Sequence, residues 1–399
     1  MPFGELARHW TLDPGIDFLN HGSFGACPRP VLEAQAELRA RMERQPLQFL
    51  ARDLEGLLDE ARGALARFVG ADPDDLAFVP NATTGVNTVL CSLEVKPGDE
   101  LLTTDHAYNA CRNALRRQEQ RGAKLAVAQV PWPIAGSRQV VEAVLASLTP
   151  RTRLALIDHV TSPTGLVFPV QELVGLLQER GVDTLVDGAH APGMLPLDVR
   201  AIGAAYYTGN CHKSLSGPKG SAFLHVRRDK QARTRPLVIS HGANSERTDR
   251  SRFRLELDWT GTDDPTPYLC VPAAIDFVGS LLPGGWPELM ARNHDLALRG
   301  RRILCEALRV EPPAPDSMLG SLVSVPLPDF DGPPPDWSEG AWYHPLQRTL
   351  LEKHRIEVPL MIFPAFPKQL VRATAYAYNS EDQFTRLAAA VGELTSGPR

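Results

Sequence analysis

The sequence lacks the features that would tie the protein to a membrane or to nucleic acid. Its 399 residues contain no uninterrupted apolar run long enough to span a bilayer, and no basic-then-apolar stretch at the N-terminus. The net charge of −5 gives no excess of basic residues for nucleic acid or an anionic membrane. We therefore predict a cytoplasmic protein with neither kind of partner.

Metal-binding and nucleotide-binding motifs are also missing. The six cysteines are scattered, with no CxxC and no paired Cys/His spacing, so we expect free thiols rather than a disulfide framework or a metal site. No GxxxxGK[ST] string occurs, which excludes a P-loop.

What the sequence does contain is a regular alternation of apolar strands and helices. This pattern predicts an α/β fold whose mainly parallel sheet is covered by helices on both faces. We expect three parts: an N-terminal segment (1–25) contributing to the active site, a large domain (26–285) and a small C-terminal α/β domain (286–399). Strands of the large domain are expected at 76–80, 100–104, 124–130, 154–160, 182–187, 204–207 and 221–226.

Two strand ends carry the residues that suggest a function. The strand at 182–187 ends on Asp187, and the strand at 204–207 leads to His212 and Lys213. Open α/β sheets place their chemistry at the carboxyl ends of strands, so the acid and the lysine can face one pocket. A lysine can attack a carbonyl to form a Schiff base, and a carboxylate can keep a pyridine nitrogen protonated. The pair predicts a pyridoxal 5′-phosphate site.

Each of these residues also has a plainer interpretation. An Asp-Gly sequence after a strand is common in turns, and a His-Lys pair commonly lies on the surface. Lys219 is a rival lysine, although its glycine and proline neighbours favour a turn.

Other polar residues fall beside expected strand ends. The stretch 81–85, Asn-Ala-Thr-Thr-Gly, leads into a helix and can cradle a phosphate, although Thr83 or Thr84 can equally be an ordinary helix cap. Arg372 lies in an otherwise apolar strand, where its charge calls for an anion, either a substrate carboxylate or a structural ion pair.

In order along the chain, these motifs resemble the class V aminotransferase group of fold-type I pyridoxal phosphate enzymes. Within that group the chain is most similar to the isopenicillin N epimerase-like branch, from about residue 15 to 396. The matching motifs are FLNHGSFG, NATTGVN, TTDHAYNA, VDGAHAPG, YTGNCHK, WTGTDDP, IEVP and VRATAYAYN. The resemblance implies a large domain with a seven-stranded type of sheet.

The resemblance implies roles around the cofactor. Lys213 would bind its aldehyde covalently, Asp187 would pair with its ring nitrogen, and His106 would stack on the ring, with Tyr108 as the alternative. The remaining residues expected to bind the cofactor are Ala82, Thr83, Ser162, His190, Asn210, His212 and, from the neighbouring subunit of a homodimer, Thr262. Those expected to bind the amino-acid substrate are Arg372, Asn20, His21 and Tyr108.

The reaction implied is removal of the α-proton of an amino acid by Lys213. Return of a proton to the opposite face would give an epimerase, and His106, Tyr108 and His21 are candidates for the second acid. The alternative is a C–S lyase acting on a cysteine conjugate or its sulfoxide. An aminotransferase and a non-catalytic cofactor-binding protein are further alternatives. Residues 359–366 contain no cysteine, so the persulfide chemistry of cysteine desulfurases is not expected.

Overall fold

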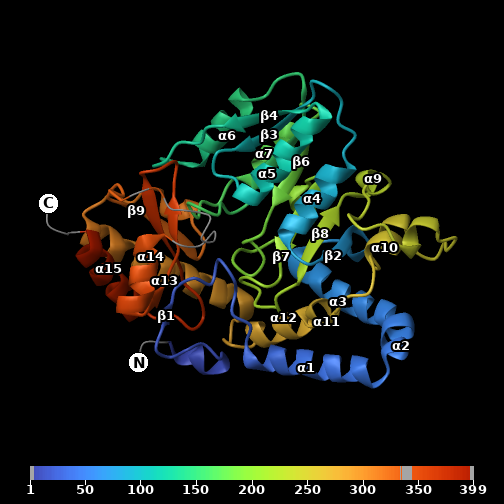
Figure 1. Cartoon of the computed structure of the whole chain (residues 1–399), viewed down its shortest axis with the longest axis horizontal. Coiled ribbons are helices and arrows are strands. Elements are labelled where there is room, and N and C mark those ends of the chain that lie inside the picture. Colours follow the sequence, from blue (N-terminus) through green and yellow to red (C-terminus); the bar gives the residue numbers. More distant parts are fainter. Residues whose placement is uncertain (1–3, 333, 335–343, 396–399) are drawn as a thin grey trace.

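A seven-stranded sheet forms the centre of the protein in the computed structural model, which describes residues 4–332, 334 and 344–395 (Figure 1). The strand order is β2-β8-β7-β6-β5-β3-β4; β8 is antiparallel to both of its neighbours, and the remaining pairs are parallel. The predicted mainly parallel, seven-stranded sheet is therefore confirmed. The bounds are β2 (Leu76–Val79), β3 (Glu100–Thr104), β4 (Lys124–Ala128), β5 (Thr152–Asp158), β6 (Asp183–Asp187), β7 (Tyr206–Asn210) and β8 (Ala222–Val226).

The strands are apolar on both faces because helices cover both sides. Along β5, Leu154 and Leu156 join one buried cluster, whereas Ala155 and Ile157 join the other. The first cluster includes side chains of α4 (Ala82–Ser92) and α5 (Asn109–Arg117). The second includes side chains of α3 (Leu54–Val69), α6 (Ser137–Ala146) and α7 (Val170–Gln178).

The helical stretch that precedes the sheet is broken at Pro46. It forms α1 (Arg29–Arg44), α2 (Pro46–Gln48) and, after a π-helical turn, α3. The other helices of this part are α8 (Val199–Ile202), α9 (Arg228–Gln231), α10 (Arg252–Leu257), α11 (Thr266–Leu269) and α12 (Val271–Gly279).

The C-terminal part has its own antiparallel sheet, in which β12 (Gln369–Thr374) lies between β11 (Leu360–Ile362) and β9 (Leu322–Leu327). Three helices accompany it: α13 (Gly285–Leu308), α14 (Pro345–His354) and α15 (Glu381–Thr395). The N-terminal segment reaches this part, because β1 (Asp17–Phe18) pairs in parallel with β10 (Ile356–Glu357). The first and last parts of the chain are thus joined (Figure 1).

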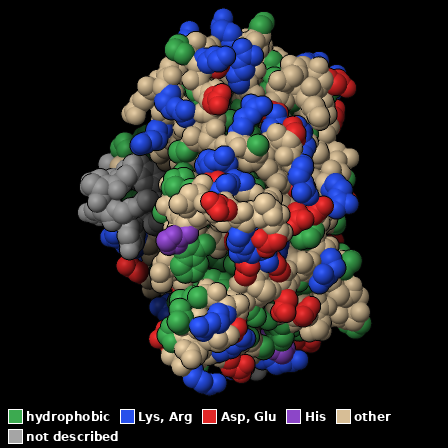
Figure 2. All heavy atoms as spheres, turned by 90° about the vertical axis from the view of Figure 1, so that its right-hand side faces the viewer, with side chains coloured by type: hydrophobic (Ala, Val, Ile, Leu, Met, Phe, Trp, Pro, Cys, Tyr) green, Lys and Arg blue, Asp and Glu red, His purple; other side chains and the backbone are tan. Residues whose placement is uncertain are grey.

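The face formed by α2, α9 and α10 mixes charges of both signs. Figure 2 shows lysine and arginine side chains interspersed with aspartate and glutamate on it. Ion pairs on this side include Arg247 with Glu55 at 2.7 Å and Arg250 with Asp59 at 2.7 Å. Among the described residues, the structure contains no helix that combines the length and the apolar character needed to cross a bilayer.

Two glycines provide a test of the packing around β6. A Cβ atom on Gly188 would overlap the ring and hydroxyl of Tyr207, whereas one on Gly175 in α7 would meet no atom within 4 Å. We predict that Gly188→Ala lowers the free energy of unfolding by about 1–3 kcal/mol through overpacking. Gly175→Ala should raise it by up to about 1 kcal/mol, because alanine favours a helix. Denaturant unfolding of both variants tests the pair, and a neutral Gly188→Ala would contradict it.

Candidate active site

A cavity of about 390 Å³ opens at the carboxyl ends of the central parallel strands. Asp158, Asp187 and Asn210 are the last residues of β5, β6 and β7, and all three line it. Lys213, from the loop after β7, lines the same cavity. The structure therefore brings the acid and the lysine that were singled out in the sequence into one site.

Lys213 lies in surroundings that favour a neutral amine. Its Nζ is 3.2 Å from Nε2 of His190, a buried side chain whose Nδ1 has no partner among the described residues. Burial, and then the positive charge of Arg372, lower the pKa of Lys213 to about 7. An amine that gives up its proton near neutral pH is suited to act as a nucleophile or a base.

Asp187 is held by two donors. The N–H of Ala189 donates to its Oδ1 at 3.0 Å, and the thiol of Cys111 donates to its Oδ2 at 3.2 Å. Burial, and then the neighbouring Asp187, raise the pKa of the Cys111 thiol, so it remains a donor. Cys111 is not among the predicted site residues, because nothing in the sequence shows that α5 brings its thiol to the end of β6.

The N-terminus of α4 faces the cavity through Asn81, Ala82 and Thr83. The prediction that a threonine caps this helix is wrong: the Asn81 side chain is the cap and accepts from the N–H of Thr84 at 2.8 Å. The side chain of Asn210 ties the helix to the sheet by accepting from the N–H of Ala82 at 2.8 Å. Helix N-termini attract anions, so this end of the cavity suits a phosphate.

Arg372 forms another wall of the cavity from β12. Its guanidinium donates to the carbonyl oxygen of Ser162 at 2.8 Å and to Oγ of Ser23 at 2.7 Å. No ion pair with a described acidic residue accompanies these contacts, and burial lowers the pKa of Arg372 to about 10. A buried guanidinium held by neutral oxygens has charge left for an incoming carboxylate.

His106 and His21 lie outside the lining of the cavity. In His106, Nδ1 is 2.8 Å from Oγ1 of Thr164 and Nε2 is 3.2 Å from the carbonyl oxygen of Val130. Both ring nitrogens of this buried side chain are thereby occupied, whereas Tyr108 lines the cavity. Of the two aromatic residues predicted for the site, Tyr108 lines the cavity and His106 does not.

His21 contacts the loop that carries Lys213. Its Nε2 is 3.0 Å from the carbonyl oxygen of Lys213, its Nδ1 is 2.7 Å from the Tyr378 hydroxyl, and its ring stacks on that of Tyr376. Nδ2 of Asn20 donates to Oε1 of Glu357 at 3.3 Å, and Asn20 does not line the cavity. Thr262 is exposed to solvent and does not line the cavity either. The remaining residues predicted for the site, Ser162, His190 and His212, do line the cavity.

Asp158 also lines the cavity, although it is not among the predicted site residues. The strand expected at 154–160 ends at Asp158 instead, so this acid lies at a strand end in the same way as Asp187. No group of three or more potential metal ligands was found in the described part of the chain.

The lowered pKa of Lys213 predicts a pH-dependent stability of the cofactor-free protein. Between about pH 7 and the ordinary value of 10.5, the unfolded chain binds a proton at this amine that the folded chain has released. The free energy of unfolding therefore rises with pH in this window, by up to about 1.4 kcal/mol per pH unit. Denaturant unfolding at several pH values should show this slope reduced in Lys213→Met and kept in the surface control Lys353→Met. An unchanged slope in Lys213→Met would contradict the assignment.

Comparisons with known proteins show the family of the chain. Residues 26–280 match the family Aminotransferase class-V. An isopenicillin N epimerase of Amycolatopsis lactamdurans is 38% identical over 96% of this chain and 96% of its own. A probable chloroplastic L-cysteine desulfhydrase of Arabidopsis thaliana is 30% identical over 98% of this chain and 84% of its own.

A solved structure gives the same result for the fold. A C-DES mutant with glycine covalently linked to its PLP cofactor matches with a TM-score of 0.78 and 22% identity, over 98% of this chain and 100% of that one. The predicted fold-type I architecture and the predicted resemblance are confirmed. The chain belongs to the aminotransferase class-V family.

Proposed function

We propose that this protein is a pyridoxal 5′-phosphate-dependent epimerase that removes the α-proton of an amino acid and returns a proton to the opposite face. The observation that carries the proposal is the arrangement of Lys213, Asp187 and Arg372 on different walls of one cavity. The isopenicillin N epimerase relatives, which match nearly the whole chain, support the reaction class.

The residues of the cavity fit this cofactor. Bound pyridoxal phosphate supplies a protonated ring that takes up the charge left when a proton is removed from the α-carbon. Asp187 offers a buried carboxylate for the ring nitrogen, and the unpartnered Nδ1 of His190 offers a hydrogen bond. The N-terminus of α4, with Asn210 and His212, lines the end that suits the phosphate.

Two residues that line the cavity are the proposed partners for proton exchange with the substrate. Lys213, with its lowered pKa, is the base that accepts the α-proton. Tyr108 is the proposed second acid, because it lines the cavity while the rings of His21 and His106 have both nitrogens engaged. Burial, and then Cys111 and Asp187, raise the pKa of the Tyr108 phenol, so it keeps the proton it would donate. Arg372 would hold the substrate carboxylate between them.

A C–S lyase is the second candidate. Elimination of a sulfur group from the β-carbon needs a single base, and Lys213 alone meets that requirement. The desulfhydrase and the hercynylcysteine sulfoxide lyase among the relatives favour this class. An aminotransferase remains a further alternative.

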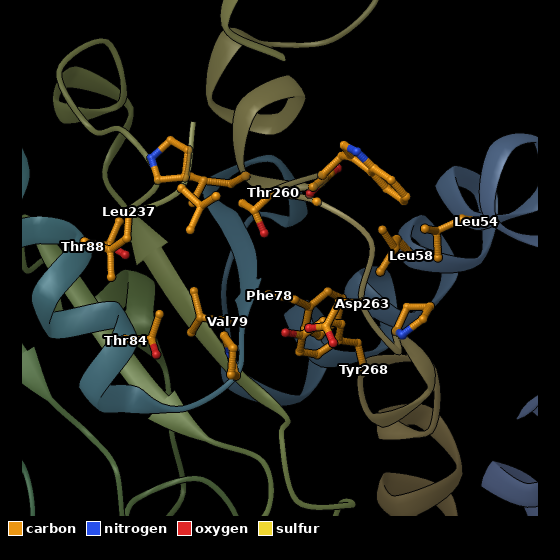
Figure 3. Close-up of a pocket in the computed structure, with 18 residues that line it drawn as sticks. Leu54, Leu58, Phe78, Val79, Thr84, Thr88, Leu237, Thr260, Asp263 and Tyr268 are labelled. Atoms are coloured by element: carbon orange, nitrogen blue, oxygen red, sulfur yellow. The ribbon is translucent and has the colours of Figure 1, made fainter. Parts of the chain in front are cut away.

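We also propose a homodimer with shared active sites. A largely apolar pocket beside the active site is lined by residues that include Leu54, Phe78, Leu237, Asp263 and Tyr268 (Figure 3). Pro80 lines both this pocket and the cofactor cavity. Val238 and Ile239, which follow Leu237 in the chain, are 58% and 61% exposed. Apolar side chains this exposed suit burial against a second copy of the protein. The exposed Thr262 would then reach the partner's phosphate site.

The division into a large domain at 26–285 and a small one at 286–399 is a proposal as well. It is supported by the separate central and C-terminal sheets.

Covalent attachment of the cofactor is the first test. The purified protein should be yellow, and borohydride should fix the cofactor to Lys213. Lys213→Ala should lose both properties, whereas the neighbouring Lys219→Ala should keep them. Absorbance and peptide mass spectrometry provide the measurement. Cofactor fixed to Lys219, or to no lysine, would contradict the assignment.

The reaction is tested by screening amino acids for a change in cofactor absorbance, followed by product analysis in deuterated water. Deuterium at the α-carbon with inverted configuration and an intact side chain supports the epimerase. Release of pyruvate supports the lyase. A protein that changes no amino acid would overturn both.

Tyr108→Phe separates the two directions of proton transfer. Loss of a general acid typically costs about 10²–10⁴-fold in rate, so inversion should fall by that factor. Exchange of the α-proton with retained configuration should persist, because Lys213 is unchanged. Chiral chromatography and NMR measure the two rates, and equal losses of both would exclude Tyr108 as the second acid.

A further inference from the structure

A second buried carboxyl group lies beside Asp187. In the parallel pair β5–β6, Asp158 is in register with Asp187, and their side chains are 2% and 4% exposed. Residues in register on neighbouring strands point to the same face of a sheet, so the two carboxyl groups meet at one end of the cavity. Both line that cavity.

The hydrogen bonds of the two carboxyl groups differ. Each oxygen of Asp187 accepts from a donor, namely the N–H of Ala189 and the thiol of Cys111. Oδ2 of Asp158 is buried, and no donor reaches it from the part of the chain that the structure describes. A buried carboxylate oxygen without a donor is costly, whereas a protonated oxygen becomes a donor itself.

The surrounding charges favour a neutral Asp158. Burial, and then the negative charge of Asp187, raise the pKa of Asp158 well above its usual range. The N–H of Tyr108 and the guanidinium of Arg112 act in the opposite direction with smaller effects. The thiol of Cys111, which faces the same pair from α5, stays protonated.

We propose that Asp158 is a positioning residue that keeps its proton and thereby leaves Asp187 as the single anion at this end of the cavity. The proposal rests on the proposed function in one respect, namely that the ring nitrogen of the cofactor binds at this end of the cavity. Two ionised carboxylates here would repel each other in a site shielded from water. A neutral Asp158 and an ionised Asp187 together match the single positive charge of a protonated ring nitrogen. The hydroxyl of the neutral Asp158 is also a hydrogen-bond donor that can orient Asp187.

Infrared spectroscopy of the cofactor-free protein tests the protonation directly. The wild type at neutral pH should show the C=O band of a protonated carboxylic acid, and Asp158→Asn should lose it. Asp183→Asn, at the opposite end of β6, is the matched control and should retain the band, because Asp183 is ion-paired with Lys230 at 2.6 Å. If Asp158→Asn leaves the spectrum in this region unchanged, the proposal is overturned. This measurement uses neither cofactor nor substrate, so an error in the proposed reaction would not affect it.

Cofactor binding provides the second readout. Asparagine is neutral and keeps a donor, so Asp158→Asn should hold pyridoxal phosphate within about threefold of the wild type. Leucine removes the donor that orients Asp187, so Asp158→Leu should weaken the binding of pyridoxal phosphate by about tenfold or more. The absorbance of the bound cofactor should titrate at the wild-type pH in the asparagine variant.

A loss of affinity in Asp158→Asn as large as in Asp158→Leu would mean that Asp158 acts as an anion, and would overturn the proposal. If the leucine variant fails to fold, the infrared band and the asparagine titration decide the question by themselves.

Discussion

The active site depends on the hydrogen-bond register of the three central parallel strands. Pairing of β5 with β6 and of β6 with β7 brings Asp158, Asp187 and the end of β7 to one edge of the sheet. The backbone of these strands is fixed by ladders on both sides and by two buried layers of side chains. The side chains at this edge therefore have little freedom, and a site built there is preorganised.

Groups of opposite charge line different walls of the cavity. Asp187 comes from the edge of the central sheet and Arg372 from β12 of the C-terminal sheet. Under the proposed function, Asp187 would face a ring nitrogen and Arg372 would face a carboxylate. Between them, burial favours the neutral form of Lys213. In surroundings of low polarity, a buried charge without a ligand raises the free energy of the folded protein. The same surroundings strengthen the electrostatic interactions of that charge when a ligand of opposite charge binds.

Apolar runs showed where the buried strands lie, and Asp187 and Lys213 were found at or beyond the ends of two of them. Arg372 was found differently, as a charge inside an otherwise apolar strand. The direction of side chains near the start of α5 was less accessible: His106 and Tyr108 are two residues apart, and tertiary packing alone decides that Tyr108 lines the cavity. Asp158 was missed because the apolar run predicted a strand over 154–160, which puts Asp158 inside the strand, whereas β5 ends on it.

The contact between two distant segments has a consequence for the order in which the cavity is completed during folding. Ser23 and Arg372 are 349 positions apart, and β1 is held by β10 over a similar separation. Contacts of such long sequence separation form slowly, because the entropy of closing the loop is lost before the contacts are gained. The wall that carries Arg372 is therefore expected to close after the local elements of the central sheet have formed.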